Sequence, residues 1–423
     1  MVEPIADQMK WASALSTRPS LEAAVDEVVQ QAQQSLEATA DLALIFISAT
    51  FASEFPRLLP LLEERLSVPH VIGCGGGGVI GQGAKGNIKE VEGAPALSLT
   101  LAHLPGVKIQ TFHVEAEDLP DLDSAPNDWI DLMGVSTAEQ PQFIILADSM
   151  TAKINDLLQG LDYAYPGAVK IGGLTSATSI MGGSGLFCDR HLHREGSVGV
   201  ALSGNLIVET IVAQGCRPIG QPYRIAEAER NILLKLEEQV ATAEVPTYGG
   251  SSRVQTPLEA LQELIQDLDE EDRTLAQHSL FVGVVRDEFK QNLEYGDFLI
   301  RSLIGVDPRV GAIAIADRIR PGQRIQFHLR DAQTSAEELK MLLKRYQKAS
   351  AKNTTSPTGA LLFSCLGRGE GLYGQADFDS QLFSRYLNNV PLSGFFCYGE
   401  IGPIGNETFL HGYTSAFGIF RQA

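Results

Sequence analysis

Three segments of this chain repeat one order of predicted elements. Each has an apolar strand, an amphipathic helix, a second strand that ends in glycine, and a further strand. The predicted strands lie at residues 42–48, 70–78 and 96–104, at 143–147, 169–177 and 197–203, and at 360–365, 390–400 and 409–420. Each copy therefore delivers a glycine-rich strand end, where the backbone is exposed and a small molecule can approach closely.

This order of elements predicts the fold class. A strand–helix–strand unit favours a right-handed parallel crossover. The following strand comes soon enough along the chain to pair antiparallel. We therefore expect a mixed α/β (α+β) fold, with mixed β-sheets, packed helices and repeated β-α-β-β units in two related domains.

The length of 423 residues favours two domains. Turn residues at 215–220 (GCRPIG) follow a predicted strand, and we place the boundary just beyond them, giving domains 1–221 and 222–423. A helix is expected at 226–241. A second helix is expected to begin at Thr256, where Pro257 and Glu259 complete a capping-box start signal.

Composition and charge exclude several classes of protein. The formal net charge of −19 disfavours nucleic acid and anionic membranes as partners. The longest apolar runs have the length of strands, and the first residues lack the basic and apolar regions of a signal peptide. The five cysteines are odd in number and show no C-x-x-C spacing, which favours reduced thiols over a disulfide framework. We expect a cytoplasmic protein.

The glycine-rich stretch at 73–86 (GCGGGGVIGQGAKG) matches G-x-G-x-x-G in three registers. A dinucleotide site also needs a helix directly after the glycines, and here residues 87–94 lead into another strand. Lys85 is followed by glycine, so the phosphate-binding loop of nucleotide hydrolases is absent too. A glycine turn near a ligand pocket is the better interpretation, and no cofactor is expected.

The third copy adds chemically active side chains to its glycine strand. Cys365 ends an apolar strand, and it is either a nucleophile, with His411 or His328 as its base, or a buried inert thiol. Arg368 lies in a glycine-rich turn, where it could grip a carboxylate or phosphate or form an internal ion pair with Glu400. Glu400 could receive a ligand ammonium, act as an acid or base, or accept backbone N–H groups.

Cys188, His191 and His193 form a C-x-x-H-x-H pattern. In a hairpin the two histidines share a face, so metal binding is geometrically possible. Their neighbours are charged residues typical of an exposed turn. We predict no metal site.

The motifs resemble those of the FIST family, an intracellular sensory module with an N-terminal and a C-terminal part. The resemblance rests on the segments 71–81 (VIGCGGGGVIG), 171–177 (IGGLTSA), 215–220 (GCRPIG), 363–369 (FSCLGRG) and 394–405 (GFFCYGEIGPIG). It implies a small ligand, with amino acids or related metabolites proposed, and it supplies no catalytic residues.

From these observations we predict an intracellular sensor that binds a small ligand and signals through an unidentified partner protein. An amino acid would suit Arg368 for its carboxylate and Glu400 for its ammonium. The alternatives are a thiol-dependent hydrolase or transferase that uses Cys365, and a protein–protein adaptor. The predicted ligand-binding residues are Cys74, Gly75, Gly76, Gly172, Gly173, Thr175, Cys365, Arg368, Gly369, Tyr398, Gly399 and Glu400.

Overall fold

The structure is a computed structural model that describes residues 8–177, 184–239, 253–293 and 296–423. The chain forms two compact units. One comprises Met1–Ala213 and Lys340–Ala423, and the other comprises Gln214–Leu339. The second unit is therefore an insertion in the sequence of the first. We call them the three-repeat unit and the inserted unit.

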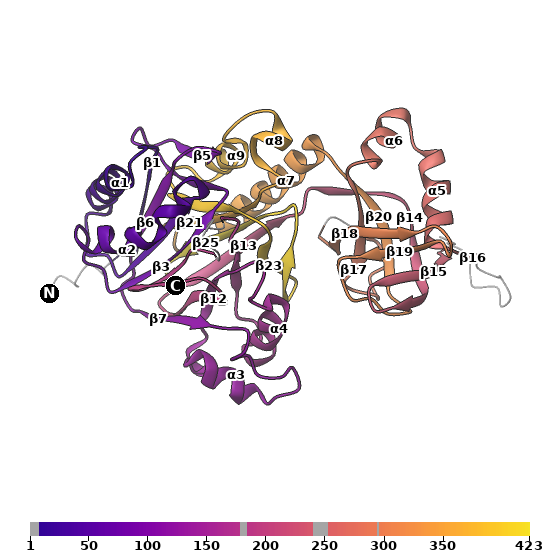
Figure 1. The fold of residues 1–423 in the computed structure, drawn as a ribbon, viewed down its shortest axis with the longest axis horizontal. Helices are drawn as coiled ribbons and strands as arrows, with labels where there is room; N and C mark the ends of the chain where they lie inside the picture. Colours follow the sequence, from indigo (N-terminus) through magenta and orange to yellow (C-terminus); the bar gives the residue numbers. More distant parts are fainter. Residues whose placement is uncertain (1–7, 178–183, 240–252, 294–295) are drawn as a thin grey trace. The chain divides into compact units, whose positions relative to one another are not determined.

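The three-repeat unit repeats one arrangement of strands and helices three times (Figure 1). Repeat 1 contains β1 (Lys10–Ser16), α1 (Leu21–Leu36), β2 (Leu42–Ser48), η1 (Ala49–Glu54), α2 (Phe55–Glu63), β3 (His70–Gly76), β4 (Gly78–Gln82), β5 (Ile88–Glu92) and β6 (Leu97–His103). Repeat 2 contains β7 (Val107–Val114), α3 (Pro126–Met133), η2 (Thr137–Glu139), β8 (Gln142–Ala147), α4 (Ile154–Ala164), β9 (Lys170–Leu174), β10 (Leu186–Cys188), β11 (His191–His193) and β12 (Ser197–Gly204). Repeat 3 contains β13 (Ile207–Ala213), α7 (Ala332–Ser350), β21 (Gly359–Cys365), α8 (Gly369–Tyr373), α9 (Phe378–Tyr386), β22 (Leu392–Cys397), β23 (Glu400–Ile404), β24 (Glu407–His411) and β25 (Ser415–Arg421).

Each repeat builds a six-stranded mixed sheet of the same topology. The strand orders are β1-β6-β2-β3-β10-β11, β7-β12-β8-β9-β23-β24 and β13-β25-β21-β22-β4-β5. In each sheet the glycine strand (β3, β9 or β22) is parallel to the strand that precedes it in the β-α-β unit (β2, β8 or β21). The closing strand (β6, β12 or β25) is antiparallel to that preceding strand. The predicted fold class is confirmed, and so is the parallel strand–helix–strand pairing in each copy. The single strand expected at 409–420 is wrong, because this segment forms β24 and β25, which belong to different sheets.

The last two strands of each sheet come from a different repeat. The β4–β5 hairpin of repeat 1 pairs with β22 of repeat 3, and the β23–β24 hairpin of repeat 3 pairs with β9 of repeat 2. The β10–β11 hairpin of repeat 2 pairs with β3 of repeat 1. These exchanges close a ring. In Figure 1 the yellow strands of repeat 3 accordingly lie among the purple strands of repeats 1 and 2.

A glycine occupies the same register position in all three glycine strands. Gly73 pairs with Ile45, Gly172 with Ile145, and Gly394 with Leu362. A Cβ atom at any of the three glycines would overlap the carbonyl oxygen of its partner on the neighbouring strand. Only glycine fits there, which explains why this residue recurs at this position of the three strands.

Both faces of these sheets are buried. A shared core includes Phe46 of repeat 1 and Phe363 and Phe395 of repeat 3, and the Phe46 and Phe395 ring centroids lie 5.2 Å apart. On the outer face of the first sheet pack α1 and α2, and on that of the second pack α3 and α4. The helices begin where capping residues allow, as at Ser20, whose side chain accepts the backbone N–H of Ala23.

The inserted unit consists mainly of strands. It contains β14 (Cys216–Glu229), β15 (Ile232–Glu238), β16 (Val254–Gln255), α5 (Pro257–Asp267), α6 (Glu270–Ala276), β17 (Leu280–Val285), β18 (Phe298–Asp307), β19 (Ala312–Ile315) and β20 (Arg324–Arg330). Its strand order is β14-β20-β17-β18-β19-β15-β16, and β14 also pairs with β15. No described helix in either unit is long and apolar enough to cross a membrane.

Two expectations for this region have different outcomes. The helix α5 begins at Pro257 with the expected capping box, in which Thr256 and Glu259 bond reciprocally. The helix expected at 226–241 is wrong where the structure describes it, because residues 226–229 belong to β14 and 232–238 to β15. The sequence boundary after residue 221 falls inside β14, so the compact units do not follow it. The division into 1–221 and 222–423 stays a prediction.

Candidate functional site

The three glycine strands end at one place, which we call the junction (residues 75–77, 174–176 and 396–398). The Thr175 hydroxyl of repeat 2 donates to the Gly75 carbonyl of repeat 1 at 2.5 Å. The Ser176 hydroxyl accepts the Gly77 N–H at 2.7 Å and donates to the Phe396 carbonyl of repeat 3. The Tyr398 N–H donates to the Leu174 carbonyl at 3.1 Å. All three repeats are thus joined by hydrogen bonds at their glycine ends.

The predicted ligand-binding residues lie in or near this junction, and the structure brings them together from all three repeats. They are nevertheless closely packed. Of the twelve residues, only Tyr398 is exposed, with 57% of its surface accessible. The Gly73–Gly86 stretch continues from β3 into β4 without an intervening helix. The assignment of these residues to a ligand stays a prediction.

Arg368 is fully buried and bound within the protein. Its Nε and Nη2 atoms lie 2.8 and 3.1 Å from the two carboxylate oxygens of Asp379. Nη2 also donates to the Tyr373 hydroxyl at 2.5 Å, and Nη1 to the Tyr413 carbonyl at 3.4 Å. The internal ion pair that we considered is therefore present, but its partner is Asp379 instead of Glu400. Asp379 lies in the first turn of α9, where it reads as an ordinary N-terminal acid.

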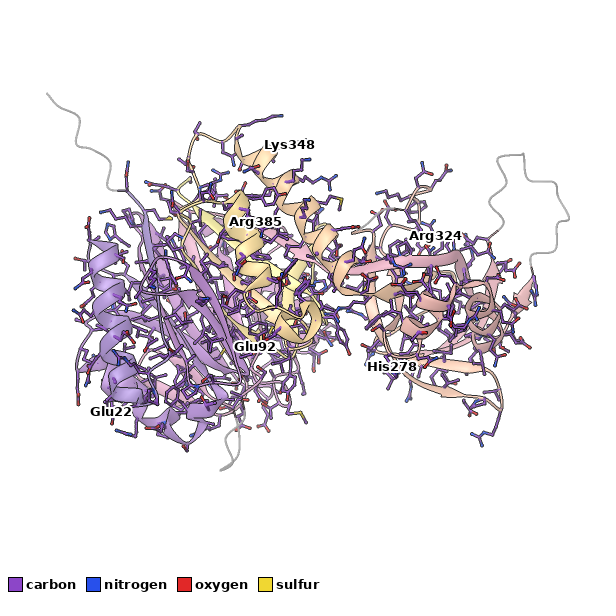
Figure 2. The ribbon with its side chains drawn as sticks, turned by 90° about the horizontal axis from the view of Figure 1, so that it is seen from above. Glu22, Glu92, His278, Arg324, Lys348 and Arg385 are labelled. Carbon is purple, nitrogen blue, oxygen red and sulfur yellow. The ribbon has the colours of Figure 1, made fainter. Side chains whose placement is uncertain are left out.

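Further acids surround this ion pair on the hairpin from repeat 1. Ser380 donates its N–H to Glu90 at 2.6 Å, and Asp377 accepts the Glu90 N–H at 2.7 Å. Burial, together with the nearby Asp379 charge, raises the pKa of Glu90 to about 8. Glu92, labelled in Figure 2, accepts the N–H of Glu370 at 2.9 Å. The β4–β5 hairpin is thus tied to α8 through the half-buried Glu92 and to α9 through the buried Glu90 and Asp377.

Glu400 is also fully buried, and burial raises the pKa of its carboxyl to about 8. Its Oε2 accepts the Thr414 N–H at 2.9 Å, and its Oε1 lies 3.4 Å from the Cys397 Sγ. The Cys365 thiol also hydrogen-bonds to this carboxyl. The polar partner of Cys365 is therefore a carboxyl group that the sequence did not pair with it.

The two histidines considered as bases for Cys365 have other positions. The His411 Nε2 lies 3.0 Å from the Gly402 carbonyl. His328 belongs to the inserted unit, where its Nδ1 lies 3.0 Å from the Gln326 carbonyl. Burial lowers the pKa of His328 to about 4. Each of these imidazole rings thus has a backbone carbonyl as a partner.

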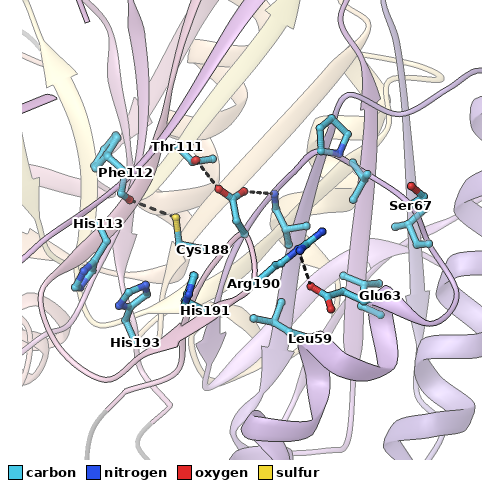
Figure 3. A pocket seen from close by; sticks show the side chains of 16 residues that line it. Leu59, Glu63, Ser67, Thr111, Phe112, His113, Cys188, Arg190, His191 and His193 are labelled. Atoms are coloured by element: carbon cyan, nitrogen blue, oxygen red, sulfur yellow. Dashed lines mark hydrogen bonds and ion pairs between the residues drawn. The ribbon is translucent and has the colours of Figure 1, made fainter. Parts of the chain in front are cut away.

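A cavity of about 1070 Å³ lies between repeats 1 and 2 (Figure 3). Repeat 1 contributes the end of α2 and the segment that leads into β3. Repeat 2 contributes β7 and the β10–β11 hairpin. The lining residues are Leu59, Leu62, Glu63, Leu66, Ser67, Val68, Pro69, Val71, Thr111, Phe112, His113, Cys188, Asp189, Arg190, His191 and His193. None of the twelve residues predicted from the sequence is in this wall.

One wall of this cavity carries three imidazole rings. The His113 and His193 rings are stacked with their centroids 3.6 Å apart, and the His191 centroid lies 6.1 Å from that of His193. Burial and the two neighbouring histidines lower the pKa of His193 to about 4. The facing wall is apolar, because Leu59, Leu62 and Leu66 of α2 and its following turn lie there. An amphipathic small molecule would find complementary surfaces on the two walls.

The turn of the β10–β11 hairpin holds the two repeats together at the cavity edge. The Asp189 carboxylate accepts the Val71 N–H of repeat 1 at 3.1 Å and the Thr111 hydroxyl of repeat 2 at 2.7 Å. Arg190 lines the cavity at its open edge, with 84% of its side chain exposed, and lies 3.5 Å from Glu63. An exposed Arg190–Glu63 pair of this length is weak, so the guanidinium is free to turn toward an anion.

The C-x-x-H-x-H pattern, for which we predicted no metal site, lies in the wall of this cavity. Cys188 donates its thiol to the Phe112 carbonyl at 3.6 Å, and burial raises the pKa of that thiol to about 11. Within the described residues no cluster of three or more histidine, cysteine or acidic side chains has an arrangement that could hold a metal ion. The C-x-x-H-x-H pattern instead contributes to the cavity wall.

A second cavity, of about 1090 Å³, lies within the inserted unit. Acidic side chains of α6 and of the start of α7 line it, among them Glu270, Glu271 and Glu337. Its cation, Arg217, is paired with Asp272 and with Asp331. This cavity therefore has an acidic wall, and the charge of its arginine is neutralised by two aspartates of the same unit.

Comparisons with known proteins identify the class of protein. The model of the FIST N domain matches residues 41–239, and that of the FIST C domain matches residues 257–403. The chain therefore belongs to the FIST family, whose domains are associated with sensory signalling and small-ligand binding. Both matches cross the boundaries of the compact units, because the FIST N match includes β14 and β15.

The mycobacterial relatives cover almost the whole chain. The uncharacterized protein Rv0628c of Mycobacterium tuberculosis is 31% identical over 413 residues, which cover 97% of this chain and 100% of that protein. The uncharacterized protein Mb0898c of Mycobacterium bovis is 31% identical, with 97% and 99% covered. The F-box/LRR-repeat protein At5g63520 of Arabidopsis thaliana is 24% identical, with 76% and 66% covered. A cyanuric acid hydrolase from A. caulinodans is 10% identical with a TM-score of 0.34, and 97% and 99% of the two chains are covered.

Proposed function

We propose that this protein is a sensor that binds a small ligand in the cavity between repeats 1 and 2 and passes its state to a partner protein. Family membership supports the sensory role. The observation that carries the choice of site is the cavity itself. Its volume is at the upper end of the few hundred to about 1,000 Å³ that is typical of ligand pockets, and it combines apolar and polar walls.

A ligand in this cavity would contact two repeats at once. The α2 side belongs to repeat 1, and the histidine side belongs to repeat 2. Binding would therefore favour whichever arrangement of the two repeats brings these walls to the ligand. A difference in affinity between two arrangements is what a sensor needs to shift its population.

We propose an amino acid or a related metabolite as the ligand. Arg190 offers a guanidinium for a carboxylate, and Glu63 beside it offers a carboxylate for an ammonium. The apolar wall of α2 would receive the side chain. The same zwitterion was predicted for Arg368 and Glu400, but there the Asp379 carboxylate already occupies the guanidinium. A ligand would have to displace a buried ion pair, which is costly.

The experiment is a thermal-shift screen of the full-length protein with amino acids and small organic acids. A ligand that binds only the folded state adds about 2.7 kcal/mol to the free energy of unfolding at a ligand concentration of 100 Kd. The melting temperature of the protein therefore rises. Arg190→Ala and His191→Ala change exposed cavity side chains and should reduce that shift. Tyr398→Ala changes the exposed side chain at the junction and serves as the matched control.

The outcomes separate the two locations. Loss of the shift in the cavity variants and its retention in Tyr398→Ala support the cavity. Loss in Tyr398→Ala with retention in both cavity variants would place the ligand at the junction and overturn our choice of site. A complete panel without any shift would argue against the amino-acid class.

A further inference from the structure

The register of repeat 3 places two cysteines side by side. Cys365 ends β21 and Cys397 ends β22, and the two are register partners on these neighbouring parallel strands. Register partners on adjacent strands direct their side chains to the same face of a sheet. Adjacent strands are about 4.8 Å apart. A disulfide bridges Cα atoms about 4.4 to 6.8 Å apart, so this pair is placed for one.

One carboxyl group contacts both thiols. The Glu400 Oε1 lies 3.4 Å from the Cys397 Sγ, and the Cys365 thiol hydrogen-bonds to the same carboxyl. The Thr414 N–H holds the other oxygen at 2.9 Å and so fixes the orientation of the group. Burial raises the pKa of Glu400 to about 8, so its carboxylate form is a stronger base than that of an exposed glutamate.

Access differs between the two sulfur atoms. Cys397 is fully buried, whereas 7% of Cys365 is exposed at the end of its strand. Gly367 is exposed, and a Cβ atom at that position would lie 3.9 Å from the Cys365 Sγ. An exposed residue without a side chain therefore lies beside this sulfur. A small oxidant would reach Cys365 before Cys397.

We propose that Cys365 and Cys397 form a redox-active dithiol that hydroperoxides convert to a disulfide, with Glu400 as the base. Glu400 takes the proton of the Cys365 thiol, and the thiolate attacks a peroxide oxygen. The O–O bond breaks, the leaving alkoxide or hydroxide takes up the proton from Glu400, and a sulfenic acid forms on Cys365. Cys397 then attacks that sulfur, the S–O bond breaks, and water leaves. Two electrons pass from the two thiols to the peroxide.

The structure also identifies a competing pair. Cys74 of β3 is fully buried and belongs to the same hydrophobic core as Cys397. It comes from another repeat, whereas Cys365 and Cys397 share a register. The proposal therefore requires that Cys365, and not Cys74, is the partner of Cys397. It goes beyond ligand sensing and does not depend on the cavity.

The test is to treat the reduced full-length protein with hydrogen peroxide, unfold it, alkylate it with N-ethylmaleimide and measure its mass. The reduced chain has five cysteines and should carry five adducts, whereas the oxidised chain should carry three. Peptide mapping without reductant should find Cys365 linked to Cys397. Persistence of five adducts, or a link between Cys74 and Cys397, would overturn the proposal.

Two variants test the individual steps. Cys397→Ser should stop the reaction at a sulfenic acid on Cys365, which dimedone traps, and Glu400→Gln should slow disulfide formation at least tenfold. Cys216→Ser, in the inserted unit, is the matched control and should react at the wild-type rate. A wild-type rate in folded Glu400→Gln would eliminate Glu400 as the base. If either variant does not fold, the wild-type peptide map alone decides whether the dithiol exists.

Discussion

At the scale of single residues, the structure assigns the charged groups of the third repeat to one another. The sequence indicated that Arg368 and Glu400 were unusual because both lie beside glycine turns. It could not indicate Asp379, because an acid in the first turn of a helix is expected on general grounds. Only the fold brings Asp379 to Arg368 and the two thiols to Glu400. The histidine cavity could not be predicted from the sequence for a related reason, because His113 lies 78 residues before His191 in the chain.

The Arg368–Asp379 pair permits a prediction about stability. Asp379→Asn removes one charge and leaves a fully buried guanidinium without its counter-ion. We expect a loss of about 3–5 kcal/mol in the free energy of unfolding, because breaking a buried pair leaves an uncompensated charge. Urea unfolding followed by tryptophan fluorescence measures this loss. Both tryptophans, Trp11 and Trp129, belong to the three-repeat unit, so the signal reports on that unit. A loss below about 1 kcal/mol would contradict it.

The buried carboxyl groups predict a pH dependence. Glu90 and Glu400 have folded-state pKa values of about 8, above the ordinary value of 4.5. Between these values the unfolded state binds fewer protons, so stability falls as pH rises. The lowered pKa values of His193 and His328 act in the opposite sense only between about 6.5 and 4. The window from pH 6.5 to 8 therefore isolates the carboxyl groups.

In that window the free energy of unfolding should decrease by up to about 1.4 kcal/mol per pH unit for each carboxyl group. Glu400→Gln cannot ionise and should reduce the slope by about half. Urea titrations at pH 6.5 and 8 provide the comparison. A wild-type stability that is constant or rises over this range would show that these groups ionise normally in the folded protein.

At the scale of elements, local sequence patterns predicted most strands. They failed where a segment could form either a helix or a strand. The three β-α-β-β copies were recognisable because apolar runs, amphipathic helices and glycine ends recur in order. Residues 226–238 include many good helix formers, yet they form the end of β14 and the whole of β15 around a turn at Arg230, which has a φ of 56°. Pairing with neighbouring strands overrides such weak local preference. The exchanged hairpins could not be predicted either, since their partners are far away in sequence.

The recurring glycines give a prediction at this scale. Alanine at Gly73, Gly172 or Gly394 would place a methyl group on the carbonyl oxygen of the adjacent strand. We expect each substitution to destabilise the three-repeat unit by about 3 kcal/mol or more, because the backbone must move. Gly371→Ala is the matched control, since a Cβ there meets nothing within 4 Å and the position lies in α8. If any of the three alanine variants had the same melting temperature as the control, the glycines would not share this structural role.

At the scale of the whole molecule, the chain is a ring of three repeats with a second unit inserted in the third. The insertion lies between β13 and the later part of α7 in sequence, and the contacts of each unit are mainly internal. Sequence families divide the chain differently, because sequence order does not record which strands pair. The three repeats are equivalent in topology but not in their side chains. This difference leaves the histidine cavity between repeats 1 and 2 and the dithiol in repeat 3.

This organisation predicts that the three-repeat unit folds without its insertion. Replacing residues 214–339 by a flexible glycine–serine linker should leave a soluble protein with cooperative unfolding, since its three sheets keep all their strands. Circular dichroism and tryptophan fluorescence can establish this. Aggregation or non-cooperative unfolding with several linker lengths would mean that the repeats depend on the inserted unit.

The central claim is that a small ligand binds between repeats 1 and 2. Hydrogen–deuterium exchange of the full-length protein, with and without a compound that raises its melting temperature, tests this claim most directly. Our account predicts added protection in the peptides that contain residues 59–71, 111–113 and 188–193. Protection confined to residues 75–77, 174–176 and 396–398, with the cavity peptides unchanged, would contradict it.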